Sequence, residues 1–414
     1  MFLSYLTSLT LLSILIGPKF DIGNRGHVRL EDILLIILSF LIITHLLYYR
    51  DLKIKKILII PLAYFFYSFA ITLVRYVGGS IDINAFVFWG KEFQYWVLFL
   101  GAYFTYRYRP RLLWKTGILA AIVIIVHGFL GYFTSNFGPY GQGVVAIGEG
   151  DSPSLSGLTF SLLCIFLFSL SRLRDVKYKR SFLRFILISL FFLTLMTASR
   201  VSIILISSFF IFIWAFRVGL PKAKIWLEHK PRILPRILFI VLILSFLFSM
   251  AFLFSSNIFR NIAIHFADPL FNRVFRRLSY ISSDMLSERL VNLSKLNSPL
   301  SALFGLGRGA LNMENGRLRS FTLSADSSYI RNIVEIGIFG SLIWFFVFWK
   351  YVLIFIKDKK TLVLYSSILF SYLFISISGE PFLLSKSASM FWIILGILLA
   401  HREYSCLQQT KRIL

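Results

Sequence analysis

Several charged side chains stand where apolar stretches of the chain end. Arg200 closes the turn Thr197–Arg200 between two apolar runs, and Asp326 stands just before another run. Arg331 and Glu335 follow at the i,i+4 spacing that places two side chains on one face of a helix. Charges at such depths are costly unless they are solvated, paired or functional. The pattern therefore indicates a functional site, while Asp326 also suits the N-cap of the next helix.

Arginine is the dominant basic residue between Asn257 and Arg331, whereas the other loops mix Lys and Arg. Guanidinium groups bind phosphate or carboxylate through paired hydrogen bonds and stay charged at any working pH. The segment is predicted to recognise an anionic group, or else to form a solvated surface against lipid headgroups. Its basic residues are Arg260, Arg273, Arg276, Arg277, Arg289, Lys295, Arg308, Arg317, Arg319 and Arg331.

Two local patterns lie inside this segment. Apolar residues at helical spacing over 266–278, beside Arg276 and Arg277, predict an amphipathic helix on the membrane surface, and a second helix is expected over 284–296. The glycines of Phe304–Gly309 permit a tight turn whose backbone N–H groups could nest an anion. The segment has no βαβ context, so it is a poor dinucleotide fingerprint.

Other polar positions have weaker signals. The loop 134–152 combines five glycines with Tyr140, Glu149 and Asp151, which suits either a sugar-contacting loop or a flexible connector. Tyr329 falls on the same helical face as Asp326. Lys91 and Glu92 are neighbours in the chain and cannot face each other on a helix, so each needs another partner or water.

Long apolar runs must position these residues. A helix needs about 20 mostly apolar residues to cross a bilayer, and about twelve runs approach that length. We therefore expect an all-α polytopic membrane protein with about 12 transmembrane helices. The runs are 2–17, 31–49, 57–74, 86–106, 112–133, 154–171, 182–198, 201–216, 233–256, 328–349, 361–378 and 388–400.

The basic residues of the short loops predict the orientation. More than half of the 44 Lys and Arg residues fall in alternate loops and the tail, which places both termini in the cytoplasm by the positive-inside rule. Three units follow: a transmembrane bundle of about nine spans over 1–256, a large outer loop with amphipathic helices over 257–326, and a bundle of about three spans with a cytoplasmic tail over 327–414.

Composition excludes several classes of protein. The chain has 414 residues, of which 57% are hydrophobic and only 15% charged, so neither a soluble multidomain protein nor a disordered chain fits. The net charge of +25 is in large part a topology signal, so no nucleic-acid partner is expected. Two separated cysteines and isolated histidines predict neither a disulfide nor a metal site.

The order of the motifs resembles the bacterial O-antigen ligase and polymerase family. The resemblance lies in the many-span layout, the Thr-Ala-Ser-Arg turn at 197–200, the large outer loop, the segment Leu-Phe-Gly-Leu-Gly-Arg-Gly at 303–309 and the stretch Ala-Asp-Ser-Ser-Tyr-Ile-Arg-Asn-Ile-Val-Glu-Ile-Gly-Ile-Phe-Gly at 325–340. It covers roughly 185–350 by motif and the rest by topology. Asp326 stands where ligases of that family typically carry histidine. This difference favours the polymerase branch of the family.

The resemblance implies a metal-independent, inverting glycosyltransferase of the multi-span, lipid-donor type, with no cofactor. It would polymerise oligosaccharide repeat units linked to undecaprenyl diphosphate at the outer leaflet, for O-antigen, capsule or exopolysaccharide. Asp326 would act as the base, with Glu335 second, and Arg200 would stabilise the departing diphosphate. The other expected diphosphate ligands are Arg308, Arg319, Arg331, Arg276 and Arg277, and the expected sugar contacts are Tyr329 and Tyr140.

The same resemblance places the protein in the bacterial cytoplasmic (inner) membrane with its site on the extracytoplasmic face. A flippase and a chain-length regulator are implied as partners. Two alternatives stay open: ligation of the glycan to another acceptor, and transport of a lipid-linked or anionic substrate. The gathering of polar features at one outer face, without a clear internal repeat, favours an interfacial enzyme over alternating access.

Overall fold

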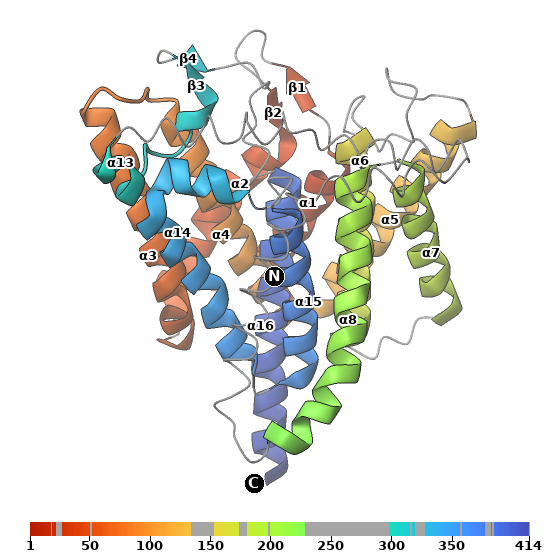
Figure 1. Cartoon of the computed structure of the whole chain (residues 1–414). Helices are drawn as coiled ribbons and strands as arrows, with labels where there is room; N and C mark the ends of the chain where they lie inside the picture. Colours follow the sequence, from red (N-terminus) through yellow and green to blue (C-terminus); the bar gives the residue numbers. More distant parts are fainter. Residues whose placement is uncertain are drawn as a thin grey trace, which may run out of the picture.

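The chain folds into a bundle of helices, here described from a computed structural model (Figure 1). The structure describes residues 1–17, 19–21, 27–49, 52–133, 153–173, 180–197, 199–227, 298–314, 317–318, 328–356, 358–376, 382 and 385–413. Its helices are α1 (Phe2–Ile16), α2 (Leu30–Tyr49), α3 (Leu52–Val77), α4 (Ala85–Tyr108), α5 (Pro110–Phe133), α6 (Pro153–Leu173), α7 (Arg180–Met196), α8 (Arg200–Leu227), α13 (Pro299–Phe304), α14 (Ser328–Phe355), α15 (Lys359–Ile375) and α16 (Ser385–Ile413), with the 3-10 turn η2 (Ala310–Asn312).

Every predicted apolar run that lies within the described residues corresponds to a helix. The run 233–256 lies outside them. Four described helical segments are long and apolar enough to cross a membrane: Leu30–Tyr48, Pro110–Leu130, Leu155–Leu173 and Arg331–Phe355. Exposed Ile and Phe side chains cover one side of α2, as expected for a surface that faces lipid. The chain is thus a helical membrane protein, and the count of about twelve spans stays a prediction.

Two short β-ladders modify the all-α expectation. β1 (Lys19–Asp21) pairs antiparallel with β2 (His27–Arg29), and β3 (Met313–Glu314) pairs antiparallel with β4 (Arg317–Leu318). Strands of two or three residues carry no periodicity that a sequence pattern could show. Both ladders lie at the same end of the bundle as α13, opposite the C-terminus (Figure 1). We call this the strand-bearing end.

Small residues set the closest helix contacts. α4 and α16 pack along each other, α8 packs on α15, and α3 and α13 both pack on α14. At Gly396 in α16, an added Cβ would lie 2.3 Å from the Phe99 carbonyl oxygen of α4. Small residues allow helix backbones to approach in this way in membrane bundles. Between these helices lies a continuous core of buried Leu, Ile, Phe, Tyr and Trp side chains.

Only part of the predicted outer loop 257–326 is described. Residues 298–314 and 317–318 form α13, η2 and the β3–β4 ladder at the strand-bearing end. The expected helices over 266–278 and 284–296 lie outside the described residues, as does the loop 134–152. The proposed three-unit division of the chain stays a prediction.

Candidate functional site

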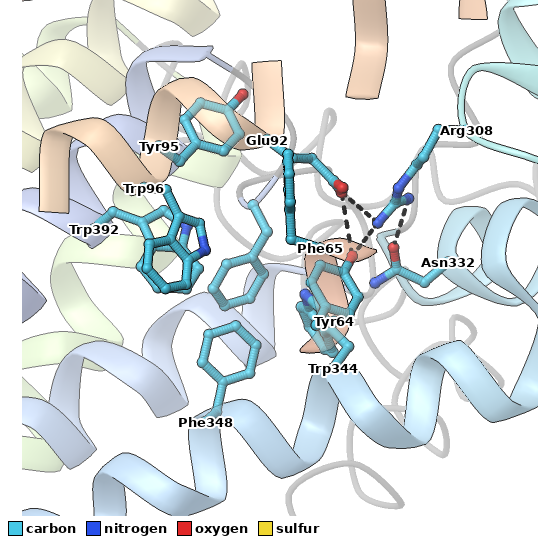
Figure 2. Close-up of a pocket in the computed structure, with 11 residues that line it drawn as sticks. Tyr64, Phe65, Glu92, Tyr95, Trp96, Arg308, Asn332, Trp344, Phe348 and Trp392 are labelled. Atoms are coloured by element: carbon cyan, nitrogen blue, oxygen red, sulfur yellow. Dashed lines mark hydrogen bonds and ion pairs between the residues drawn. The ribbon is translucent and has the colours of Figure 1, made fainter. Parts of the chain in front are cut away.

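A buried arginine, Arg308, stands at the centre of a polar cluster near the strand-bearing end of the bundle. Its side chain is only 2% exposed. One terminal nitrogen lies 2.6 Å from Glu92 Oε1 of α4, and the other lies 3.0 Å from Glu335 Oε2 of α14. It also donates to Asn332 Oδ1 at 3.0 Å and to the Tyr64 hydroxyl (Figure 2). Arg308 therefore joins helices α3, α4 and α14.

The loop that presents Arg308 is shaped by glycines. Gly305, Gly307 and Gly309 all adopt positive φ angles of 77–96°, which glycine tolerates without a steric penalty. The predicted tight turn is therefore present. The backbone N–H groups of 305–308 are not free to nest an anion, because protein oxygens already accept them. Leu306 N donates to Val334 O at 2.8 Å, Gly307 N to Glu335 O at 2.8 Å and Arg308 N to Thr72 Oγ1 at 3.1 Å.

Glu92 is held in place by residues of α3 as well as by Arg308. Its Oε1 accepts from the Tyr64 hydroxyl at 3.2 Å, and its Oε2 accepts from Ser68 Oγ at 3.0 Å. The sequence indicated that Glu92 needs a partner other than Lys91, and Arg308 is that partner. A carboxylate at this depth is tolerated because it is both paired and hydrogen-bonded.

The pair of Arg331 and Glu335 forms as predicted from its spacing. Arg331 Nε donates to Glu335 Oε1 at 3.1 Å within α14. The carboxylate of Glu335 is 1% exposed, and each of its oxygens meets a different guanidinium group. Glu335 thus holds two arginines at once through charge-assisted contacts.

The four charges balance within the cluster. Two arginines face two carboxylates in the alternating order Glu92, Arg308, Glu335, Arg331. Burial alone would lower the pKa of Arg308, but the nearby Glu92, Tyr64 and Glu335 outweigh burial and raise that pKa. Arg308 is therefore permanently charged, and removing either carboxylate would leave it short of a buried counter-ion.

Beside the cluster lies a pocket with aromatic walls (Figure 2). The space that it encloses is small, about 30 Å³. The polar side is formed by Arg308, Glu92, Asn332 and Tyr64, whereas the remaining walls are almost entirely aromatic. Those other lining residues are Phe65, Tyr95, Trp96, Trp344, Phe348, Phe382 and Trp392. A pocket with mostly aromatic walls and a few convergent polar groups has the general character of a ligand site.

Arg200, one of the predicted arginines, begins helix α8, although its side chain lies outside the described atoms. The preceding turn packs against α6, where a Cβ on Gly157 would lie 2.5 Å from Thr197 Oγ1. The Ser199 and Ser202 hydroxyls share a hydrogen bond of 2.7 Å. Thr197 and Ser199 are therefore tightly packed immediately before α8 begins.

The remaining predicted residues are placed differently. The Tyr329 hydroxyl donates to Leu373 O at 2.7 Å, so it ties α14 to α15. Asp326, Arg319, Arg276, Arg277 and Tyr140 lie outside the described residues. The structure thus brings together Arg308, Arg331 and Glu335 from the predicted set. Among the described residues, no group of three or more His, Cys, Asp or Glu side chains is arranged to hold a metal ion.

Sequence reasoning missed part of the cluster. Tyr64 and Asn332 carry no charge and resemble many other polar residues in apolar runs, so no pattern marked them. The signal for Glu92 was present, since an acidic residue inside an apolar run requires a cation from another element. The identity of that cation, Arg308, is known only from the packed structure.

Comparison with known proteins adds no family assignment. No protein-family model matches the sequence, and no curated protein matches it at a significant level.

Proposed function

We propose that this chain is an inner-membrane glycosyltransferase that polymerises oligosaccharide repeat units carried on undecaprenyl diphosphate. The supporting observation is the contact between the two segments that carry the family resemblance. Arg308, from the glycine-rich segment, pairs with Glu335 of the helix that follows Asp326. Two neighbouring motifs thus contribute to one buried polar cluster, and Glu92 of α4 joins them from a distant part of the chain, as is typical of an active site assembled from several elements.

In this proposal, the arginines bind and stabilise the departing diphosphate. Arg200 is placed at the N-terminus of α8, where the helix dipole already favours an anion. Arg319, Arg276 and Arg277 are the other proposed ligands. Arg308 and Arg331 are proposed ligands as well, but a diphosphate would have to compete with Glu335 for them. Glu335 accordingly holds the arginines in place rather than accepting a proton.

The proposed reaction is a single displacement. The acceptor hydroxyl passes its proton to the carboxylate of Asp326 as its oxygen bonds to the anomeric carbon of the donor. The bond between that carbon and the diphosphate oxygen breaks, and undecaprenyl diphosphate leaves with the bonding electron pair. One displacement inverts the anomeric configuration, so no covalent enzyme intermediate forms. The growing chain moves from its lipid carrier to the non-reducing end of a new lipid-linked unit.

The direct test is elongation by the purified protein. The full chain, reconstituted in liposomes without an ion gradient, is given an undecaprenyl-diphosphate-linked oligosaccharide. We expect a ladder of longer lipid-linked products together with released undecaprenyl diphosphate. Movement of the unchanged oligosaccharide across the bilayer would instead identify a transporter. Transfer to an added non-repeat acceptor, without a ladder, would identify a ligase, and the absence of all three would reject the proposal.

A further inference from the structure

Helix α14 is broken at Gly337, next to the buried cluster. Gly337 has φ 71° and ψ 179°, a conformation that is essentially restricted to glycine. In a continuous helix, the carbonyls of 334, 335 and 336 would accept from the N–H groups four residues later. Donors from outside the helix approach all three carbonyls. These are Leu306 N on Val334 O at 2.8 Å, Gly307 N on Glu335 O at 2.8 Å and the Tyr67 hydroxyl on Ile336 O at 3.1 Å.

Tyr67 marks the interruption most clearly. Its hydroxyl donates to Ile336 O at 3.1 Å, one residue before the break. Its ring packs against Gly340 on the other side of the break, where an added Cβ would lie 2.5 Å from Tyr67 Cε1. Helix α3 therefore contacts α14 on both sides of Gly337.

The segment 298–314, which we call the strap, lies against this break with its backbone. A Cβ on Gly305 would lie 2.5 Å from Glu335 O, and a Cβ on Gly337 would lie 2.3 Å from Leu303 O. Such distances leave no room for a side chain on either residue. The two glycines therefore allow the strap and α14 to touch backbone to backbone.

Arg75 of α3 secures the strap from the other side. Its Nε and one terminal nitrogen donate to Gly305 O at 3.0 and 2.7 Å, and the same terminal nitrogen donates to Ser301 Oγ at 3.2 Å. Arg308 N adds a bond to Thr72 of α3. The strap is thus held by polar contacts to α3 and α14 rather than by a large apolar face of its own, since Leu300, Leu303 and Phe304 are exposed.

The strap also forms one wall of the aromatic pocket, because it carries Arg308. If the strap left α14, Arg308 would leave Glu92 and Glu335, and the polar side of the pocket would open. At the same time, the carbonyls of 334 and 335 could accept from N–H groups of the helix itself, so these two backbone acceptors have donors in either arrangement. Release also separates Arg308 from two buried carboxylates, which makes the docked arrangement the favoured one.

We propose that the strap and the break in α14 form a two-state gate over the pocket. With the strap docked, α14 is broken and Arg308 closes the polar side of the pocket. With the strap released, α14 becomes continuous and the pocket opens toward the strand-bearing end. The gate would control entry to the pocket whatever ligand enters it, so its test does not depend on the proposed reaction.

Hydrogen exchange of the full chain in lipid nanodiscs distinguishes the two states. Gly337→Ala disfavours the broken conformation. We expect the amides of Leu306–Arg308 to exchange at least tenfold faster in this variant, and those of 338–340 to exchange more slowly than in the parent protein. Gly90→Ala is the matched control, because an added Cβ there meets nothing within 4 Å. Faster exchange in both segments would indicate simple local unfolding and would overturn the gate, as would an unchanged strap.

A second variant loosens the strap without altering α14. Arg75→Gln removes the paired donors to Gly305 O, and it should produce the same opposite changes at 306–308 and 338–340. Arg111→Gln, on the exposed surface of α5, is its control. If Gly337→Ala does not fold, Arg75→Gln alone decides the matter: unchanged or uniformly faster exchange would reject the gate.

Thiol labelling reports the opening of the pocket itself. In a background of Cys164→Ser and Cys406→Ser, Trp96→Cys places a thiol on the pocket wall. A small, water-soluble methanethiosulfonate should label this thiol at least tenfold faster when Gly337→Ala or Arg75→Gln is added than when Gly90→Ala is added. Equal labelling rates would show that the strap does not control access.

Discussion

The carboxylate of Glu92 lies 2.6 Å from the guanidinium of Arg308, although the two residues come from opposite halves of the chain. Arg308 lies in turn 3.0 Å from Glu335, which binds Arg331. This chain of alternating charges connects α4, the strap and α14. It explains how four charged side chains can be buried at one end of a membrane protein, since each has a partner of opposite sign.

The pair of Glu92 and Arg308 should show strong energetic coupling. Breaking a buried ion pair by removing one partner typically costs about 3–5 kcal/mol, because the other charge stays buried. We expect Glu92→Gln and Arg308→Met each to lower the unfolding temperature clearly in detergent, and the double variant to lose much less than the sum of the two. Arg180→Met, at an exposed position in α7, is the control. Simple additivity would contradict the pairing.

The contact of α16 with α4 should depend on Gly396. Gly396→Ala places a Cβ 2.3 Å from Phe99 O, so the two helices would have to separate. Overpacking of this kind costs about 1–3 kcal/mol, and thermal unfolding of the purified protein measures it. Gly90→Ala serves as the control and should be neutral or slightly stabilising, because alanine favours a helix over glycine. Equal effects of the two substitutions would argue against this close approach.

Asp326→Asn tests the proposed base. The amide keeps the shape of the side chain but cannot take the acceptor proton, so we expect the elongation rate to fall by about 10²–10⁴-fold. Binding of the lipid-linked donor should change much less. The control is Asp82→Asn, in the turn between α3 and α4. An unchanged rate and an unchanged product length in Asp326→Asn would remove this residue from the reaction.

Arg200→Lys tests paired binding of the diphosphate. Lysine keeps the charge but lacks the planar fork, so it cannot reproduce a bidentate contact. We expect elongation to fall by about 10²-fold, the usual effect of losing one electrostatic contact in the transition state. Arg180→Lys, also at the start of a helix, should retain full activity. Equal activity of Arg200→Lys and the parent protein would leave Arg200 without this role.

The orientation of the bundle can be tested by labelling single cysteines. The positive-inside rule places the turn containing Ser80 outside the cell and Tyr404 in the cytoplasm. In a background of Cys164→Ser and Cys406→Ser, a membrane-impermeant maleimide should label Ser80→Cys in intact spheroplasts. Tyr404→Cys should react only after the membrane is permeabilised. Both side chains are exposed, so access is decided by the membrane. The reverse pattern would invert the topology and place the pocket at the wrong face for the proposed donor.

The sequence by itself determined where the apolar parts of the long described helices lie and which near neighbours pair. It did not predict α13, the continuation of α8 to Leu227 or that of α16 to Ile413. A long apolar run in a membrane must satisfy its backbone hydrogen bonds internally, so its position along the chain is sufficient to predict a helix. The pair of Arg331 and Glu335 was equally predictable, because i,i+4 neighbours meet on any helix. The turn at Gly305–Gly309 followed from the conformational freedom of glycine.

Only the tertiary structure decided how these parts meet. Glu92 pairs with Arg308, and protein oxygens accept from the N–H groups of the glycine turn at 305–307. Helix α14 is interrupted at Gly337, although its apolar run predicts one continuous helix. Each of these outcomes depends on which surfaces pack together across large separations in the chain. Local periodicity does not say which distant segments will pack together. The partner of a buried charge and the position of a helix break are therefore decided only when the helices are assembled.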